Sequence, residues 1–216
     1  RYMDEALEYY EEDGRIWAVN AYQNPYFKVP KKYPYDLYLN PVNMCWGWGT
    51  WKDRWEGVDF DLKDWPKDRK DMDLVDRLNK AGRYIIPLLE AQYAGRLKTW
   101  DVQCTYHVVK HGLRCVEPIY QLSKNIGFGT DGEHCASNMP FFTRQKYYNF
   151  TPRMVKDIGE TDAIQRQWEY LNWNKNLARN PKYEFCREYI QVKCYSMFDD
   201  IIKIEIITKS EIRGVI

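Results

Sequence analysis

The sequence predicts an α/β fold, because two of its segments each contain a helix followed by a short strand. In residues 2–21 and again in residues 100–120, apolar side chains recur at helical spacing, and a short apolar run follows after a glycine. The chain of 216 residues is long enough to bury a substantial core. We therefore expect one domain, or one domain with a tail.

The first predicted pair opens the chain. Residues 2–12 place apolar and acidic side chains on opposite helical faces, and Gly14 follows the helix. Residues 15–21 are a short buried strand. Residues 22–43 contain four prolines, so we expect a long irregular loop with at most one short strand.

Helices are expected in the middle of the chain. Residues 50–56 can begin a helix, and residues 61–82 carry another, in which Pro66 marks a break or a start. The apolar run in residues 83–94 contains Pro87, which argues against a central strand.

The second helix and strand pair is expected after Thr99. This residue has the side chain of an N-cap for a helix over residues 100–111, and residues 113–120 follow as a strand. Further on, we expect a glycine-rich loop in residues 121–138, a polar helix in residues 152–178 and an edge strand in residues 201–207.

The composition excludes some partners. The 32 Lys and Arg residues nearly balance the 31 Asp and Glu residues, so no overall field attracts nucleic acid or an anionic membrane. Aromatic residues make up 16% of the chain, which suits contact with sugars or peptides and suits core packing equally well.

The six cysteines include no Cys-x-x-Cys pair, which argues against a zinc ribbon, a thioredoxin-like site and a disulfide scaffold. We expect reduced thiols in a cytosolic protein. No apolar run approaches the roughly 20 residues that span a bilayer, and the first residues do not have the pattern expected of a signal peptide. The chain begins at Arg1 without an initiator Met, so we expect a piece of a longer protein.

Residues 44–55 carry four of the nine tryptophans, and glycines separate the first three. Indoles bury a large apolar area and keep an N–H donor. The stretch is therefore either a core corner or the wall of a pocket for a ring-shaped, hydroxyl-rich ligand. We expect Trp55, at its helical end, to belong to the core.

Asp101 is predicted in the first turn of a helix, beside Trp100. A carboxylate at this position stabilises the helix through its dipole. It is also a candidate general base for a hydroxyl that binds in the neighbouring pocket. The sequence alone leaves both roles open.

Histidines give two further candidate sites. His134 follows two acids in a glycine loop, where it either ligates a metal or phosphate or lies at the surface. His107 and His111 have the spacing of a zinc pair but lack the adjacent glutamate of a metalloprotease. The chain contains no phosphate-binding loop, dinucleotide fingerprint or hydrolase nucleophile elbow.

Four segments combine into a family pattern: Tyr2 to Ala21, Cys45 to Trp55, Thr99 to Gln103, and Ser123 to His134. In this order they resemble the acceptor half of bacterial nucleotide-sugar glycosyltransferases of the GT-A fold, the family 2-like sugar transferases. The second and fourth are specific, because neither composition nor a generic fold demands them. The resemblance covers residues 1–140 as a first domain and leaves residues 141–216 as an extension without an assigned role.

The resemblance implies a partial GT-A-like fold, a mixed sheet flanked by helices, from which the N-terminal nucleotide-binding half is absent. It makes Asp101 the catalytic base of an inverting transfer. It places His134 near the diphosphate or a divalent metal, Mn or Mg. The acceptor-binding residues that it implies are Trp46, Gly47, Trp48, Trp51 and Trp100.

The implied enzyme transfers a sugar from a nucleotide sugar to a glycan or lipid-linked acceptor in polysaccharide biosynthesis, in the cytoplasm at the inner face of the membrane. The family's Asp-x-Asp motif precedes the point that matches Arg1, so we expect this chain alone to bind donor nucleotide weakly or not at all. The alternative is a noncatalytic carbohydrate-binding or scaffold module. A metal-dependent hydrolase that uses His107 and His111 is the third hypothesis.

Overall fold

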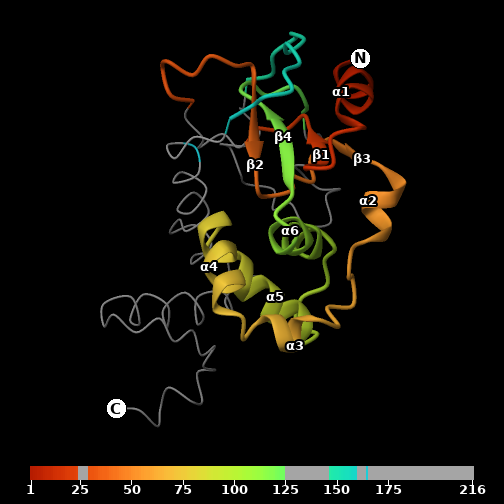
Figure 1. The fold of residues 1–216 in the computed structure, drawn as a ribbon, viewed down its shortest axis with the longest axis vertical. Helices are drawn as coiled ribbons and strands as arrows, with labels where there is room; N and C mark the ends of the chain where they lie inside the picture. The colour runs from red at the N-terminus through yellow and green to blue at the C-terminus, as the bar shows by residue number, and fades with distance from the viewer. Residues whose placement is uncertain (24–28, 125–145, 160–163, 165–216) are drawn as a thin grey trace.

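The computed structural model describes residues 1–23, 29–124, 146–159 and 164 (Figure 1). These residues form a small mixed sheet with helices packed beside it, which confirms the predicted α/β class. The strands are β1 (Ile16–Asn20), β2 (Leu37–Asn40), β3 (Trp48–Thr50) and β4 (Arg114–Pro118). The helices are α1 (Tyr2–Tyr10), α2 (Lys52–Glu56), α3 (Trp65–Asp68), α4 (Met72–Ala81), α5 (Ile85–Tyr93) and α6 (Asp101–Lys110).

The four-stranded sheet has the order β2-β4-β1-β3. Its central strands, β1 and β4, are parallel, whereas β2 and β3 pair antiparallel with β4 and β1. A parallel pair requires a crossover connection. Here the crossover contains β2, β3 and helices α2 to α6, and α6 leads directly into β4.

Side-chain alternation along β4 shows how the two faces of the sheet are covered. Val116 lies in one core cluster with Ala6 and Tyr10 of α1. Its neighbour Cys115 lies in another cluster with Cys104 of α6. Because successive strand residues point to opposite faces, one face of the sheet packs on α1 and the other on α6.

A helical layer of α3, α4 and α5 packs against α6 (Figure 1). Asp71 caps α4, where its carboxylate accepts from the backbone N–H groups of Asp73 at 3.0 Å and Leu74 at 3.2 Å. Pro87 lies in the first turn of α5, where its missing N–H breaks no helical hydrogen bond. The apolar run around Pro87 is therefore helical.

Three details differ from the sequence prediction. The predicted helix over residues 61–82 is two helices, because Pro66 starts the short α3 and α4 begins separately. The cap position of α6 is Trp100, and Thr99 precedes it. Residues 152–159 contain no helix, so the predicted helix over residues 152–178 is wrong for this part. The predicted strand over residues 201–207 lies outside the described residues.

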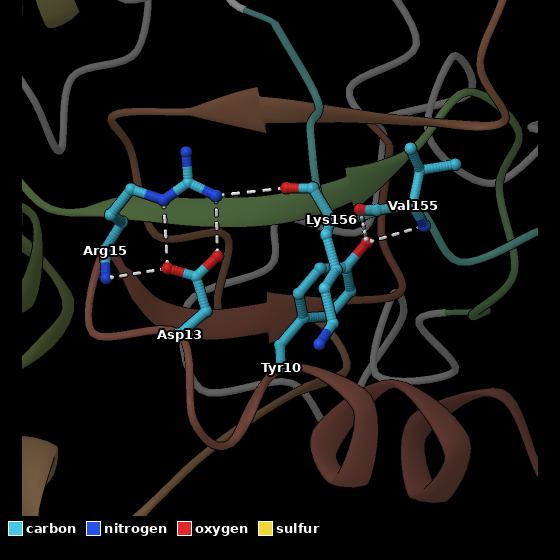
Figure 2. A network of polar contacts seen from close by, with 5 residues as sticks. All are labelled: Tyr10, Asp13, Arg15, Val155 and Lys156. Atoms are coloured by element: carbon cyan, nitrogen blue, oxygen red, sulfur yellow. Dashed lines mark hydrogen bonds and ion pairs between the residues drawn. The ribbon is translucent and has the colours of Figure 1, made fainter.

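Residues 146–159 follow an extended path along α1 and the sheet, and Figure 2 shows where they are held. The Tyr10 hydroxyl donates to the carbonyl of Val155 at 2.8 Å and accepts from its N–H at 3.3 Å. Arg15 pairs with Asp13 and donates to the carbonyl of Lys156 at 3.0 Å. This segment, beyond the predicted domain boundary at residue 140, therefore packs on α1 and β1, and the boundary stays a prediction. In the described part of the chain no helix is long and apolar enough to cross a bilayer.

Candidate functional site

Three indoles form a stack that links the sheet to α6. Trp48 of β3 stacks on Trp17 of β1, with ring centroids 5.7 Å apart and planes at 12°. Trp100, directly before α6, stacks on Trp48 at 5.5 Å and 28°. Trp17 is fully buried, whereas Trp100 is 42% exposed. This indole stack therefore runs from the core to the surface and ends in an indole that faces solvent.

Trp55 of α2 lies beside the indole stack. Its ring centroid is 5.8 Å from that of Trp48 and 6.1 Å from that of Trp100. On its other side it contacts Phe60 at 4.7 Å. Trp55 is half-buried and packs against the core cluster that contains Trp17, so it contributes to the core as expected without being fully buried. The fully buried indole of this cluster is Trp17, which lies outside the stretch.

The short strand β3 places Trp48 in the stack. Within β3, Gly49 faces α1, where an added Cβ would lie 3.0 Å from Leu7. The alternation along the strand turns Trp48 to the opposite face. Gly47 has a φ of +88°, and an added Cβ would lie 2.8 Å from the Cβ of Ser123. The glycines around Trp48 are therefore required by backbone conformation and by close packing.

The other two predicted acceptor tryptophans lie against different parts of the fold. Trp46 packs edge-on against Tyr22 at 4.8 Å, and its carbonyl accepts from the Ser123 hydroxyl at 2.8 Å. Trp51 packs in the core cluster on the α1 side and carries the Arg54 guanidinium 3.6 Å from its ring centroid. The structure thus brings Trp48 and Trp100 together in the indole stack, whereas Trp51 lies on the α1 side.

Asp101 is the first residue of α6 and follows the exposed Trp100. One of its carboxylate oxygens accepts a hydrogen bond from the Thr99 hydroxyl, and that hydroxyl also accepts from the Asp101 N–H at 3.4 Å. Among the described residues, none donates to the second oxygen. The carboxylate is half-buried, is oriented by one partner and complements the positive end of α6. It has the position of a base beside an aromatic surface.

His107 and His111 contact each other on α6, with ring centroids 4.5 Å apart. Burial lowers the pKa of His107 to about 4 and also lowers that of His111, so both are neutral near pH 7. Within the described segments, no group of three or more His, Cys, Asp or Glu side chains is placed to hold a metal ion. Among the described residues, His107 and His111 therefore have no third side chain of these types beside them with which to hold a metal ion. His134 lies outside the described residues.

A polar cluster that the sequence did not predict lies in the centre of the sheet, around the fully buried Glu117 of β4. Asn20 donates from its side-chain amide to Glu117 Oε1 at 3.2 Å, and Asn40 donates to the same oxygen. The Tyr38 hydroxyl donates to Oε2. Burial raises the pKa of Glu117 to about 8, although these hydrogen bonds act in the opposite direction. The carboxyl is therefore mainly protonated at neutral pH.

The sequence contains one signal for this cluster. Glu117 stands inside an apolar run that was predicted as a strand, and an acid at such a position either faces solvent or needs buried partners. Its partners are Asn20 of β1 and Asn40 of β2, which precede Glu117 by 97 and 77 residues in the sequence. Only the pairing of the strands reveals them.

Comparisons with known proteins gave no relative for this chain. No family model matches it, and no match was found among curated proteins or solved structures. The indole stack, Asp101 and the polar cluster are therefore the features that bear on function.

Proposed function

We propose that this chain is the acceptor-side part of a glycosyltransferase, which transfers a sugar from a nucleotide sugar to a glycan or lipid-linked acceptor in polysaccharide biosynthesis. The observation that carries the proposal is the position of Asp101, which directly follows the exposed Trp100. We place the enzyme in the cytoplasm at the inner face of the membrane, where a lipid-linked acceptor is presented.

The chemistry begins with stacking of a sugar ring on the indole of Trp100. An indole face offers apolar area to the C–H face of a pyranose, and its N–H remains available for a hydrogen bond. A sugar held there presents hydroxyl groups toward the start of α6. The free oxygen of Asp101 accepts the proton of the attacking hydroxyl, while the Thr99 hydroxyl holds the other oxygen in place. The nucleophilic oxygen then attacks the anomeric carbon of the donor sugar with inversion, while the bond from that carbon to the diphosphate breaks and the nucleoside diphosphate leaves with the bonding electrons.

Binding of neutral sugars tests the surface directly. Methyl glucoside, methyl galactoside, methyl mannoside and their disaccharides are titrated into the chain, and tryptophan fluorescence reports occupancy of the indole stack. Trp100→Ala should weaken binding by about tenfold or more, as is typical when a central aromatic contact is lost. Tyr93→Ala is the matched control, because Tyr93 is 47% exposed at the end of α5, in the helical layer. Equal losses in both variants contradict the proposal.

The catalytic role needs a separate measurement. The longer protein that contains this chain is assayed for transfer with a panel of nucleotide sugars, and wild type is compared with Asp101→Asn. The amide nearly keeps the shape of the carboxylate but cannot accept the proton. We expect sugar binding to be retained and turnover to be lost by a factor of about 100 or more. Unchanged turnover removes Asp101 from the mechanism.

A noncatalytic carbohydrate-binding module is the second candidate. The observation in its favour is that the indole stack needs no donor-binding half to bind a sugar, since all its residues lie on β1, β3 and the start of α6. The two candidates differ in one outcome. Sugar binding that depends on Trp100, together with absence of transfer in the longer protein, supports the module.

A further inference from the structure

Two buried asparagines beside the Glu117 cluster carry polar atoms without partners. Within the described residues, Oδ1 of the fully buried Asn20 accepts no hydrogen bond. Asn43 is 5% exposed, and neither its Nδ2 nor its Oδ1 has a hydrogen-bond partner there. Each such buried atom destabilises the fold relative to one that has a hydrogen-bond partner. Proteins generally satisfy these groups, and an exception points to a ligand, an ordered water or strain.

The two asparagines are linked through the same network. Asn20 and Asn40 both donate to one oxygen of Glu117, so their side chains are neighbours. Asn40 in turn accepts from the N–H of Val42 at 2.9 Å, and Asn43 follows directly. Through Glu117, Asn40 therefore connects Asn20 at the end of β1 to the segment after β2 that contains Asn43.

This region adjoins the proposed acceptor site on two sides. Asn20 is the residue of β1 that pairs with Trp48 of β3. The N–H of Asn43 donates to the Thr105 hydroxyl at 3.3 Å. Thr105 and Asp101 are four residues apart on α6 and so share a helical face. Asn43 also precedes residues 44–46, which are only half-buried.

From these contacts we propose that Asn20 and Asn43 form a subsite that binds a hydroxyl group of the neutral acceptor sugar. The subsite rests on the proposed function and extends it, because it makes these two amides specificity-determining residues of the same site. Asn43 offers one donor and one acceptor, and Asn20 offers one acceptor. A hydroxyl group accepts from the Asn43 amide and donates its one proton to one of the two amide oxygens, so it satisfies two of these atoms at once.

The chemistry of the cluster disfavours other ligands. In this region the unpaired donor is the Asn43 amide, because the donors around Glu117 already bind its carboxyl group. A lone amide donor gives an anion little compensation for desolvation. A cation would find two amide oxygens and a carboxyl group whose oxygens already accept from three donors. A neutral hydroxyl remains.

The test removes one hydroxyl from the sugar and one amide from the protein. Methyl glucoside, methyl galactoside and methyl mannoside are compared with their monodeoxy analogues in wild type, in Asn43→Leu and in the smaller Asn43→Ala. One deoxy analogue should bind wild type about tenfold more weakly than its parent, since a site with unpaired polar groups rejects a ligand that lacks the matching hydroxyl. Both variants should bind the parent about tenfold more weakly and no longer distinguish it from that analogue.

The outcomes separate the subsite from the proposed function. If the Asn43 variants keep both the affinity and the discrimination of wild type, and unfold at a higher denaturant concentration, the unpaired atoms bind only water or store strain, and the subsite is refuted. The dependence of binding on Trp100 then still stands. If wild type binds none of these sugars, both proposals are refuted. Trp65→Phe serves as the stability control, because it removes a buried hydrogen bond to Glu90 in the helical layer.

Discussion

Glu117→Gln should change how the stability of the protein depends on pH. In the folded protein Glu117 is fully buried and its pKa is raised to about 8, primarily because burial disfavours the charged form. A glutamine at this position reproduces the protonated acid: its oxygen accepts from the amides of Asn20 and Asn40, and its NH₂ donates to the Tyr38 oxygen. The substitution therefore removes the titration while keeping the network.

The direction follows from the two pKa values. Below the ordinary value of 4.5 the carboxyl is protonated in both the folded and the unfolded chain. Between 4.5 and about 8 the unfolded chain has lost the proton and the folded chain keeps it, so the free energy of unfolding falls as pH rises. Each unit is worth about 1.4 kcal/mol, which gives a ceiling of about 5 kcal/mol for this one group. Above about pH 8 the contribution of the protonated Glu117 to the free energy of unfolding is fully lost.

The measurement is urea unfolding followed by tryptophan fluorescence, at several values between about pH 5 and about pH 8. At the acidic end wild type and Glu117→Gln should have similar free energies of unfolding. As pH rises, wild type should fall below the variant by several kcal/mol, because only wild type must hold a buried carboxyl that tends to ionise. Parallel pH profiles of the two proteins would refute the reasoning, since Glu117 would then titrate alike in both states.

Two further substitutions, Gly47→Ala and Tyr10→Phe, test how segments are joined to the sheet. Gly47→Ala should lower the free energy of unfolding by about 2–4 kcal/mol, because it combines a left-handed backbone with a contact to Ser123. Gly95→Ala is the control: at a φ of +68° with open space around it, this variant should lower the free energy of unfolding by only about 1–2 kcal/mol. Equal losses for the two variants in urea unfolding would show that the contact with Ser123 adds nothing to the loss in Gly47→Ala. Tyr10→Phe removes the hydrogen bonds to Val155 and should cost about 1 kcal/mol and speed limited proteolysis within residues 146–159. An unchanged cleavage rate would mean that this hydroxyl does not hold the segment.

The sequence predicts the two helix and strand pairs well because their signals are local. In α1 and α6 the apolar spacing gives the helix, and the short apolar runs that follow give β1 and β4. The long connection after β1 was expected to hold at most one short strand, and its described residues hold one, β2, since the prolines interrupt longer pairing. The three-residue β3 was missed, because glycine and tryptophan in so short a run carry no periodicity, and the strand exists through its pairing with β1.

The candidate site was predictable only where its residues are adjacent in sequence. Trp100 and Asp101 are such a pair, and the structure places them at the start of α6 as expected. The buried polar cluster depends on strand register, which sets Tyr38 opposite Glu117 across β2 and β4. A shift by one residue would turn Glu117 to the other face of the sheet, and no local pattern fixes that choice.

The stacking of Trp48 bears on both interpretations of the tryptophan stretch. Trp48 has an indole stacked on it from β1 and a second one from the start of α6, so it packs against the core and against the proposed acceptor surface at once. The exposed indole of the stack is that of Trp100. Its removal uncovers Trp48, which then offers a recessed indole to the same sugar. We therefore expect Trp100→Ala to weaken sugar binding. Trp48→Ala should weaken sugar binding more than Trp100→Ala does. It should also lower the free energy of unfolding by about 3–5 kcal/mol, as measured by urea unfolding. A Trp48→Ala protein of wild-type stability would contradict the stack as a structural element.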